Sequence, residues 1–472
     1  KYTGGHIYSD NASDIVHAST NYVSVYSLYG GERTVTLPAG NYSVYDVYEK
    51  QYVDVNGNSF TFSLNDNDAK LFRLMEAEKI AVLAQTNGGH AQLSAPGVSQ
   101  VTPGSDYAVT VTVDFGYYLA GVRINGKTEV FATGSLDFSG SEPMAEDTPF
   151  RISSLSKLMG GALALDLVAE GRLALDDDVS RWLPGLGGLR VLASPDAPLS
   201  VTVPIRGPVT LRHLLTFTAG FGIDFGQTPY SAATRELLWG PNPPDMDPDT
   251  YLARLTELPL AAQPGQRWMY HSGADLLSVL LWKVAGKPVS QLLAERITGP
   301  FGLAGTGFPT GSEAFPAVYQ AEDGELVEAE DYRDAFSAPP RFESLAGGMV
   351  STVPDYLAFL AALADDVLLP AGVAAELASD QLVGSQRGGF TEMSGPAESW
   401  GYMTAVQTEP GDPWSEPGMW GWAGGSGTSA AVYPNGDIGV VFTQRFMSGP
   451  QDSFDWFWEP FGRVRAELHS RD

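Results

Sequence analysis

The spacing of apolar residues changes once along this chain, between about residues 110 and 150. In NYVSVYSLYG (21–30) and RTVTLPAGNYSVYDVY (33–48), apolar and polar residues alternate between turns rich in Gly, Pro and Asn, which is typical of half-buried strands. From about residue 150, apolar residues recur at helical spacing in runs that end at glycine. The 472 residues exceed one ordinary domain. The two patterns therefore predict a small all-β module followed by an α/β (α+β) domain.

The residue composition changes in the same region. Up to Lys127 there are five lysines and three arginines, whereas from residue 128 there are three lysines and seventeen arginines. Nine asparagines precede residue 128 and only two follow it. Two modules of different origin would explain the shift. The predicted domains are a β-sandwich-like accessory module at 1–76, a strand and linker segment at 77–108 and a large domain at 109–472, with 94–105 as the best linker candidate.

Six segments of the large domain carry clear secondary-structure signals. We expect a helix over 154–171, helical runs over 211–222 and 273–288, a helix from Pro354, a hairpin around 434–436 and a closing helix over 456–470. No repeat of fixed period is present in the sequence.

Composition excludes several classes of function. The formal net charge of −28 and the pI near 4.4 argue against nucleic acid or an anionic membrane as partner. With no cysteine, the chain has no disulfide, thiolate metal site or cysteine nucleophile. No window approaches eighteen consecutive apolar residues, so no transmembrane helix is expected. The first residues lack the apolar core of a signal peptide, so we expect that a signal peptide was either removed or lies outside this sequence. The compartment stays open, with a secreted or periplasmic location favoured.

One lysine stands in an unusual setting. Lys157 lies among apolar residues, three positions after Ser154. On a helix this spacing puts both side chains on one face. Desolvation lowers the pKa of a buried lysine, so its neutral amine can take the proton of a serine hydroxyl. The free N–H groups at the start of the helix can hold an oxyanion. By itself the pair is equally compatible with a structural role.

Further segments place this pair in a known context. PFRISSLSKLMGGALALDLVAEG resembles the nucleophile helix of the serine β-lactamase and penicillin-binding-protein superfamily, in its class C-like branch. Four later segments resemble that family in the same order: VTLRHLLTFTAGFG, AAQPGQRWMYHSGADLLSVLLWKVAGKP, LAGGMVSTVPDYLAFLAAL and GWAGGSGTSAAVYPNGDIGVVFTQR. The resemblance covers roughly residues 110–470. It implies an antiparallel sheet flanked by helices, plus an all-helical region. Separately, PAGNYSVYDVY followed by NSFTFSLNDNDAKLFRL resembles the small β-sandwich that often ends a glycoside hydrolase, and this resemblance covers about 75 residues.

The resemblance implies a role for each matching residue. Ser154 falls at the nucleophile, Lys157 at the general base and Tyr270 at the residue that passes a proton to the leaving group. A tyrosine does this only if a nearby cation lowers its pKa, and Lys157 is the candidate. The N–H groups of Ser154 and Gly425 would form the oxyanion hole.

Two motifs depart from the family pattern. Tyr270-His271-Ser272 replaces Tyr-x-Asn, and the serine reaches less far than an amide. Trp422-Ala423-Gly424 replaces the Lys-Thr-Gly of antibiotic-hydrolysing members, which removes the cation for a substrate carboxylate and offers an apolar wall. The same replacement is typical of family VIII carboxylesterases. Arg445 could restore a positive charge. Ser272, Trp422, Ala423 and Gly424 are the predicted substrate-binding residues.

The sequence thus predicts a serine hydrolase that cleaves small-molecule carboxylic esters through an acyl-enzyme, with no cofactor. A β-lactamase or a peptidase for D-amino-acid peptides is one alternative, and a non-catalytic binding protein on the same fold is another. His213 and His271 are interpreted as structural, and no HExxH or paired histidine spacing indicates a metal. No G-x-S-x-G elbow supports an α/β-hydrolase. The oligomeric state and the acyl specificity stay open.

Overall fold

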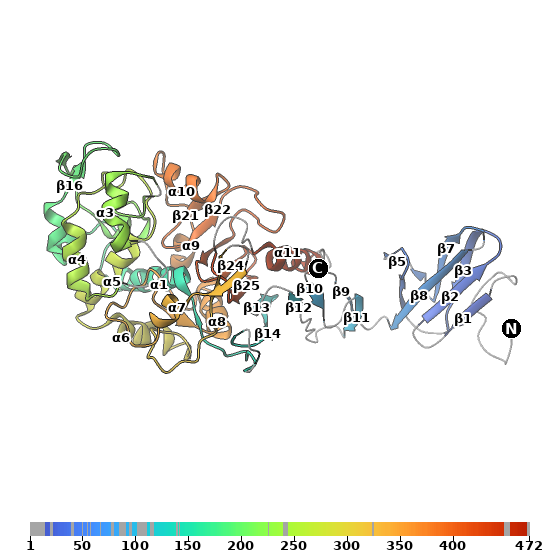
Figure 1. Cartoon of the computed structure of the whole chain (residues 1–472). Helices are drawn as coiled ribbons and strands as arrows, with labels where there is room; N and C mark the ends of the chain where they lie inside the picture. Colours follow the sequence, from blue (N-terminus) through green and yellow to red (C-terminus); the bar gives the residue numbers. More distant parts are fainter. Residues whose placement is uncertain are drawn as a thin grey trace. The chain divides into compact units, whose positions relative to one another are not determined.

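The structure is a computed structural model, shown in Figure 1. It describes residues 15–18, 22–38, 42–49, 51–53, 55–56, 58–66, 68–76, 80–84, 91–93, 97–101, 111–113, 118–137, 140, 142–224, 226–238, 244–322, 325–447 and 454–469. The chain divides into two compact units, Lys1–Asp114 and Phe115–Asp472. The three predicted domain ranges stay a prediction.

The first part of the first unit contains a five-stranded and a three-stranded antiparallel sheet. The five-stranded sheet has the order β1 (Ile15–Ala18), β2 (Tyr22–Ser27), β8 (Asp68–Glu76), β4 (Tyr42–Asp46) and β5 (Gln51–Val53), and the three-stranded sheet has the order β3 (Gly31–Thr36), β7 (Ser59–Leu64) and β6 (Val55–Asn56). Alternation in β2 buries Val23 and Val25 and leaves Tyr22 and Tyr26 exposed. The buried valines pack with Phe60 and other apolar side chains of both sheets. The predicted small all-β region is confirmed.

Short strand pairs occupy the segment that was expected to hold a linker. Strand β9 (Ile80–Ala84) pairs with β11 (Gly97–Val101), and β10 (Ala91–Leu93) pairs with β12 (Val111–Val113). Within the linker candidate 94–105, residues 97–101 form strand β11, where Val98 pairs with Leu83, and the linker role stays a prediction. The other residues of that range lie outside the described residues.

A seven-stranded antiparallel sheet organises the second unit. Its order is β14 (Lys127–Thr133), β13 (Tyr118–Ile124), β25 (Ile438–Thr443), β24 (Thr428–Val432), β23 (Trp420–Gly424), β22 (Ala405–Gln407) and β21 (Glu398–Trp400). The pairing of β13 with β25 joins the first and last parts of this unit. The hairpin predicted around 434–436 is confirmed, and Gly436 has a φ of 84° in its turn.

Helices cover both faces of this sheet. A Cβ on Gly121 of β13 would lie 2.6 Å from Val353 of α8 (Val353–Ala364), so α8 packs closely on that face. Gly121 pairs with Val440, and the adjacent Gly439 faces the other way. A Cβ on Gly439 would lie 2.6 Å from the Trp458 ring of α11 (Asp455–His469). The predicted antiparallel sheet flanked by helices is confirmed, as is the closing helix.

The remaining helices form the helical region and its surroundings. They are α1 (Ser156–Ala169), α2 (Leu211–Leu215), α3 (Pro229–Leu238), α4 (Pro248–Thr256), α5 (Ser272–Ala285), α6 (Val289–Leu293), α7 (Glu330–Asp334), α9 (Val373–Leu377) and α10 (Gln386–Ser394). The short strands are β15 (Phe150–Arg151), β16 (Arg190–Leu192), β17 (Thr202–Pro204), β18 (Tyr319–Glu322), β19 (Glu325–Glu328) and β20 (Val350–Ser351). Figure 1 shows α3, α4 and β16 together at one end of this unit.

Two predicted helices had different outcomes. Helix α5 ends at Ala285, within the predicted run 273–288, because Gly286 adopts a left-handed conformation with a φ of 67°. The run over 211–222 is helical only to Leu215, since Phe217 has a φ of 56°, which no helix allows. Phe217 instead stacks against Trp400 with ring centroids 5.0 Å apart. Packing of one aromatic ring therefore overrides the local helical pattern.

Candidate active site

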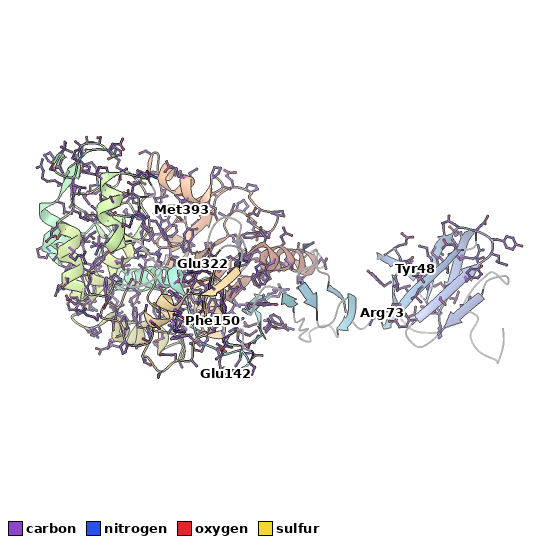
Figure 2. All side chains as sticks on the ribbon, viewed as in Figure 1. Tyr48, Arg73, Glu142, Phe150, Glu322 and Met393 are labelled. Atoms are coloured by element: carbon purple, nitrogen blue, oxygen red, sulfur yellow. The ribbon has the colours of Figure 1, made fainter. Side chains whose placement is uncertain are left out.

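The turn that carries Ser154 lies between strand β15 and helix α1. Phe150, which Figure 2 labels, is buried and packs on Phe442 of the sheet, and Ile152 and Leu155 are also buried. A 3₁₀ turn, Ser153–Leu155, then leads into α1, whose side chains are buried over most of its length. Ser154 is the partly exposed residue in this turn. The hydroxyl of Ser154 is thus presented from an otherwise buried segment.

Lys157 lies directly behind this hydroxyl. Its side chain is fully buried, its Nζ is 2.9 Å from Ser154 Oγ, and it also bonds the carbonyl oxygen of Ala346. Burial disfavours the charged amine and lowers the pKa of Lys157 to about 7, although the carboxylate of Asp275 opposes this shift. Near neutral pH a large fraction of Lys157 is therefore an uncharged amine.

Tyr270 reaches the same hydroxyl from the segment that precedes α5. Its Oη donates to Ser154 Oγ at 2.8 Å and accepts from Trp422 Nε1 at 2.8 Å. Burial raises the pKa of Tyr270 to about 12, although its hydrogen bonds to Ser154 and Trp422 act in the opposite direction. The expectation that Lys157 lowers this pKa is wrong for the resting site. The physical reason is that burial of the phenol disfavours its charged form more than the hydrogen bonds to Ser154 and Trp422 favour it.

The third motif approaches the turn from strand β23. A Cβ on Gly424 would lie 2.6 Å from the carbonyl oxygen of Ile152, so only glycine allows this contact. The exposed Gly425 follows directly, while Ala423 is half-buried. The N–H of Ser154 lies at a helix start and that of Gly425 at a strand end, positions where backbone donors are often left for other partners. This arrangement fits an oxyanion hole.

Comparison with known proteins bears directly on this geometry. The family model described as Beta-lactamase matches residues 90–458, which is more than half of the chain. The chain belongs to the Beta-lactamase family. The resemblance to serine β-lactamases and penicillin-binding proteins predicted from the motifs is thereby confirmed, and the fold class with it.

Relatives of this Beta-lactamase family member include esterases. Protein Rv1367c of Mycobacterium tuberculosis is 32% identical over 66% of this chain and 81% of its own. Esterase EstB of Burkholderia gladioli is 32% identical over 59% of this chain and 72% of its own. The solved structure of EstCE1, described as a hydrolase with promiscuous acyltransferase activity, is 26% identical, has a TM-score of 0.62 and covers 74% of this chain and 93% of its own.

The second motif of this Beta-lactamase family member leads into helix α5. Ser272 is fully buried, and its Oγ has no hydrogen-bond partner within the described ranges. Ser272 begins α5 inside the core, and its role in substrate binding stays a prediction. His271, with a φ of 86°, lies 3.4 Å from Asp275, and His213 closes a capping box with Thr210. These contacts agree with the structural interpretation of both histidines.

Besides its hydrogen bond to Tyr270, the Trp422 side chain contacts several aromatic rings that the sequence did not reveal. Its ring lies 4.9 Å from that of Trp400, 5.8 Å from that of Tyr270 and 6.3 Å from that of Phe390. Trp268 stacks on Tyr270 at 5.6 Å. These rings, with Phe217, form an aromatic cluster beside Ser154. Trp268 could have been noticed next to the Tyr270 motif, but Trp400 and Phe390 belong to no motif.

Two further findings concern metal ligands and membrane spans in the described residues. Within the described ranges, no group of three or more His, Cys, Asp or Glu side chains could hold a metal ion. The described helices also include none with the length and hydropathy needed to cross a membrane.

Proposed function

We propose that this protein is a serine hydrolase that cleaves carboxylic esters through an acyl-enzyme on Ser154. One observation supports the proposal above all others. Lys157 Nζ and Tyr270 Oη lie 2.9 Å and 2.8 Å from the same oxygen, Ser154 Oγ. A nucleophile in contact with two proton-transfer groups is the arrangement that acyl transfer requires.

Hydrogen-bond directions explain how the serine is activated. Trp422 donates to Tyr270, and Tyr270 donates to Ser154. With Lys157 uncharged and donating to Ala346, its lone pair is left to accept the serine proton. As Oγ attacks the ester carbonyl carbon, that proton moves to Nζ. The developing oxyanion accepts from the N–H groups of Ser154 and Gly425.

The raised pKa of Tyr270 is compatible with proton transfer to the leaving group. After the first step Lys157 is an ammonium, and its Nζ lies 4.7 Å from the centre of the Tyr270 ring. This new cation and the Trp422 N–H stabilise a phenolate, so Tyr270 can pass its proton to the departing alkoxide and recover one from Lys157. Water then attacks the acyl-enzyme by the same route in reverse, which releases the acid and restores Ser154.

The substrate class follows from the third motif. Trp422 places an indole where antibiotic-hydrolysing relatives have a cation, and this indole is continuous with the cluster of Trp400 and Phe390. An apolar wall favours uncharged acyl or alcohol groups over carboxylates. We therefore propose neutral esters as substrates, in preference to β-lactams or D-amino-acid peptides.

The test compares three substrates on the full chain. p-Nitrophenyl butyrate is expected to turn over faster than p-nitrophenyl hemisuccinate, which carries a carboxylate, and faster than nitrocefin. A fluorophosphonate probe is expected to block turnover, and mass spectrometry should find it on the peptide that contains Ser154. Absence of ester turnover together with absence of labelling would support the non-catalytic alternative. Faster hydrolysis of nitrocefin would support the β-lactamase alternative.

Acyl transfer to an alcohol is a second candidate. EstCE1 is described as a hydrolase with promiscuous acyltransferase activity, and the half-buried Trp422 ring, 5.8 Å from that of Tyr270, offers an apolar surface for an acceptor alcohol. Added butanol would then raise p-nitrophenol release and yield butyl butyrate. Product that remains entirely butyric acid would limit the activity to hydrolysis.

The pH dependence of catalysis tests the base directly. Lys157 must be uncharged to accept a proton, and burial lowers its pKa to about 7. We expect kcat/KM to fall about tenfold per pH unit below that value and to reach a plateau above it. A pH series with p-nitrophenyl butyrate measures this ascending limb of the pH profile, between the low rates at acidic pH and the plateau. A profile that is flat from pH 5 to 8 would contradict Lys157 as the base.

A further inference from the structure

A chain of buried hydroxyls lies beneath the two candidate oxyanion donors. Ser153 precedes Ser154, and Ser426 follows Gly425. Ser153 donates to Ser426 at 2.8 Å, and Ser426 donates to the carbonyl oxygen of Arg151 at 2.8 Å. Ser153 also lies 2.9 Å from Tyr332 Oη. Since the Ser153 proton is already used, Tyr332 is the donor in that contact.

This hydroxyl chain connects the two backbone segments that carry the donors. Ser153, Ser426 and Tyr332 are 4%, 1% and 2% exposed, so water does not compete for their bonds. Thr428 adds a parallel bond to the carbonyl oxygen of Ile152 at 3.1 Å. Side-chain hydrogen bonds therefore join the turn before Ser154 to the loop around Gly425. They lie on both sides of the close contact between Gly424 and the carbonyl oxygen of Ile152.

The backbone of Ser153 shows why such a connection is needed. Its φ is 44°, in the left-handed region that non-glycine residues rarely adopt. The peptide group between Ser153 and Ser154 carries the Ser154 N–H, so the conformation of Ser153 orients that donor. Its carbonyl oxygen accepts from the Ser156 hydroxyl at 2.6 Å, and its side chain is held by Ser426. These bonds hold the strained conformation.

Tyr332 provides a rigid anchor for the chain of hydroxyls. Its ring lies 5.1 Å from that of Phe336 and 4.8 Å from that of Phe446. The Arg151 guanidinium lies 5.5 Å from the Tyr332 ring and 4.6 Å from the Phe315 ring, and it donates to the carbonyl oxygen of Pro316. The phenol therefore has little freedom to move away from Ser153.

We propose that Ser153 and Ser426, anchored by Tyr332, are positioning residues that hold the N–H groups of Ser154 and Gly425 at the separation an oxyanion requires. The proposal rests on the proposed function. Donors that act on the tetrahedral state stabilise it more than the bound ester. Loosening them should therefore lower kcat and leave KM nearly unchanged.

The experiment uses Ser426→Ala, Ser153→Gly, their double variant and Tyr332→Phe in the full chain. Glycine at 153 keeps the positive φ accessible while it removes the hydroxyl. We expect kcat on p-nitrophenyl butyrate, per fluorophosphonate-titrated site, to fall about tenfold in each serine variant, which is less than the loss of a whole donor. KM should stay within about twofold. The double variant should lose little more than either single one, because both remove one shared bond.

Matched controls separate positioning from general destabilisation. Ser429→Ala removes a buried hydroxyl that accepts from Trp458, and Tyr433→Phe removes a buried phenol that donates to Trp414. Both should keep kcat. A boronic acid forms a tetrahedral adduct with the nucleophile. Its affinity for each serine variant should fall by about the same factor as kcat.

Two results would overturn the proposal while leaving the proposed function intact. One is an unchanged kcat per titrated site in Ser426→Ala and in the isosteric Tyr332→Phe. The other is a loss confined to KM with boronate affinity unaffected. If Ser426→Ala yields no folded protein, Tyr332→Phe decides the question alone. Failure of the proposed function is seen separately, as wild-type protein that neither turns over ester nor takes up the probe.

Discussion

Ser154→Ala is expected to lower kcat/KM for p-nitrophenyl butyrate by about 10⁴-fold or more, because no acyl-enzyme can form without the nucleophile. Neighbouring serines do not replace it. The Ser153 hydroxyl donates to Ser426 and the Ser156 hydroxyl donates to the Ser153 carbonyl, and both side chains are buried. Steady-state kinetics with protein at high concentration measures the residual rate, and the fluorophosphonate label should disappear from the peptide.

The control for this variant is Ser180→Ala, which changes a serine on a separate turn, Val179–Arg181. Its activity should equal that of the wild type. Retention of more than about a tenth of the activity in Ser154→Ala would assign the reaction to another nucleophile.

Lys157→Met is expected to lower kcat/KM by about 10³-fold, in the range that a positioned general base contributes. Methionine fills the buried space without a nitrogen, so Ser154 keeps its surroundings but loses the group 2.9 Å away that accepts its proton. Lys157→Arg should be as inactive, since a guanidinium does not release its proton in this pH range. Both variants are assayed from pH 5 to 9, where the ascending limb near pH 7 should be absent.

Lys283→Met is the matched control for the lysine variants. Lys283 is partly exposed and pairs with Asp249 at 2.6 Å, on the far turn of α5 from Tyr270. We expect its kinetics to match those of the wild type. Wild-type rates in Lys157→Met, or an ascending limb that persists in it, would place the base at another residue.

Local patterns were sufficient to predict much of the large domain. Helix α8 has an N-cap at Thr352, a proline in its first turn and an apolar face, all of which act within a few residues. Helix α5 ends at a left-handed glycine for an equally local reason. Helix α2 was predicted too long because the chain turns at Phe217 to stack on Trp400, which is distant in sequence. The partner of strand β11 could not be predicted, because its pairing with β9 is not visible in its own composition.

In the candidate site, too, the local features were predicted from the sequence and the contacts between distant segments were not. Ser154 and Lys157 were found because their spacing and apolar setting are local. The aromatic neighbours Trp400 and Phe390 and the hydroxyl of Ser426 come from remote segments, and neither aromatic rings nor serines are distinctive by type. The pKa of Tyr270 was predicted in the wrong direction, because the burial that raises it comes from residues of distant segments and cannot be seen in the motif itself.

The burial of Lys157 also has a thermodynamic consequence for the whole domain. In the unfolded chain its pKa is near 10.5, whereas in the folded protein burial lowers it to about 7. Between these two values the unfolded chain binds more protons, so folding expels a proton into solvent and stability due to this residue increases as the solution becomes more alkaline. At neutral pH the residue therefore costs folding free energy. The burial that makes the Lys157 amine available as a base thus also lowers the stability of the folded domain at neutral pH.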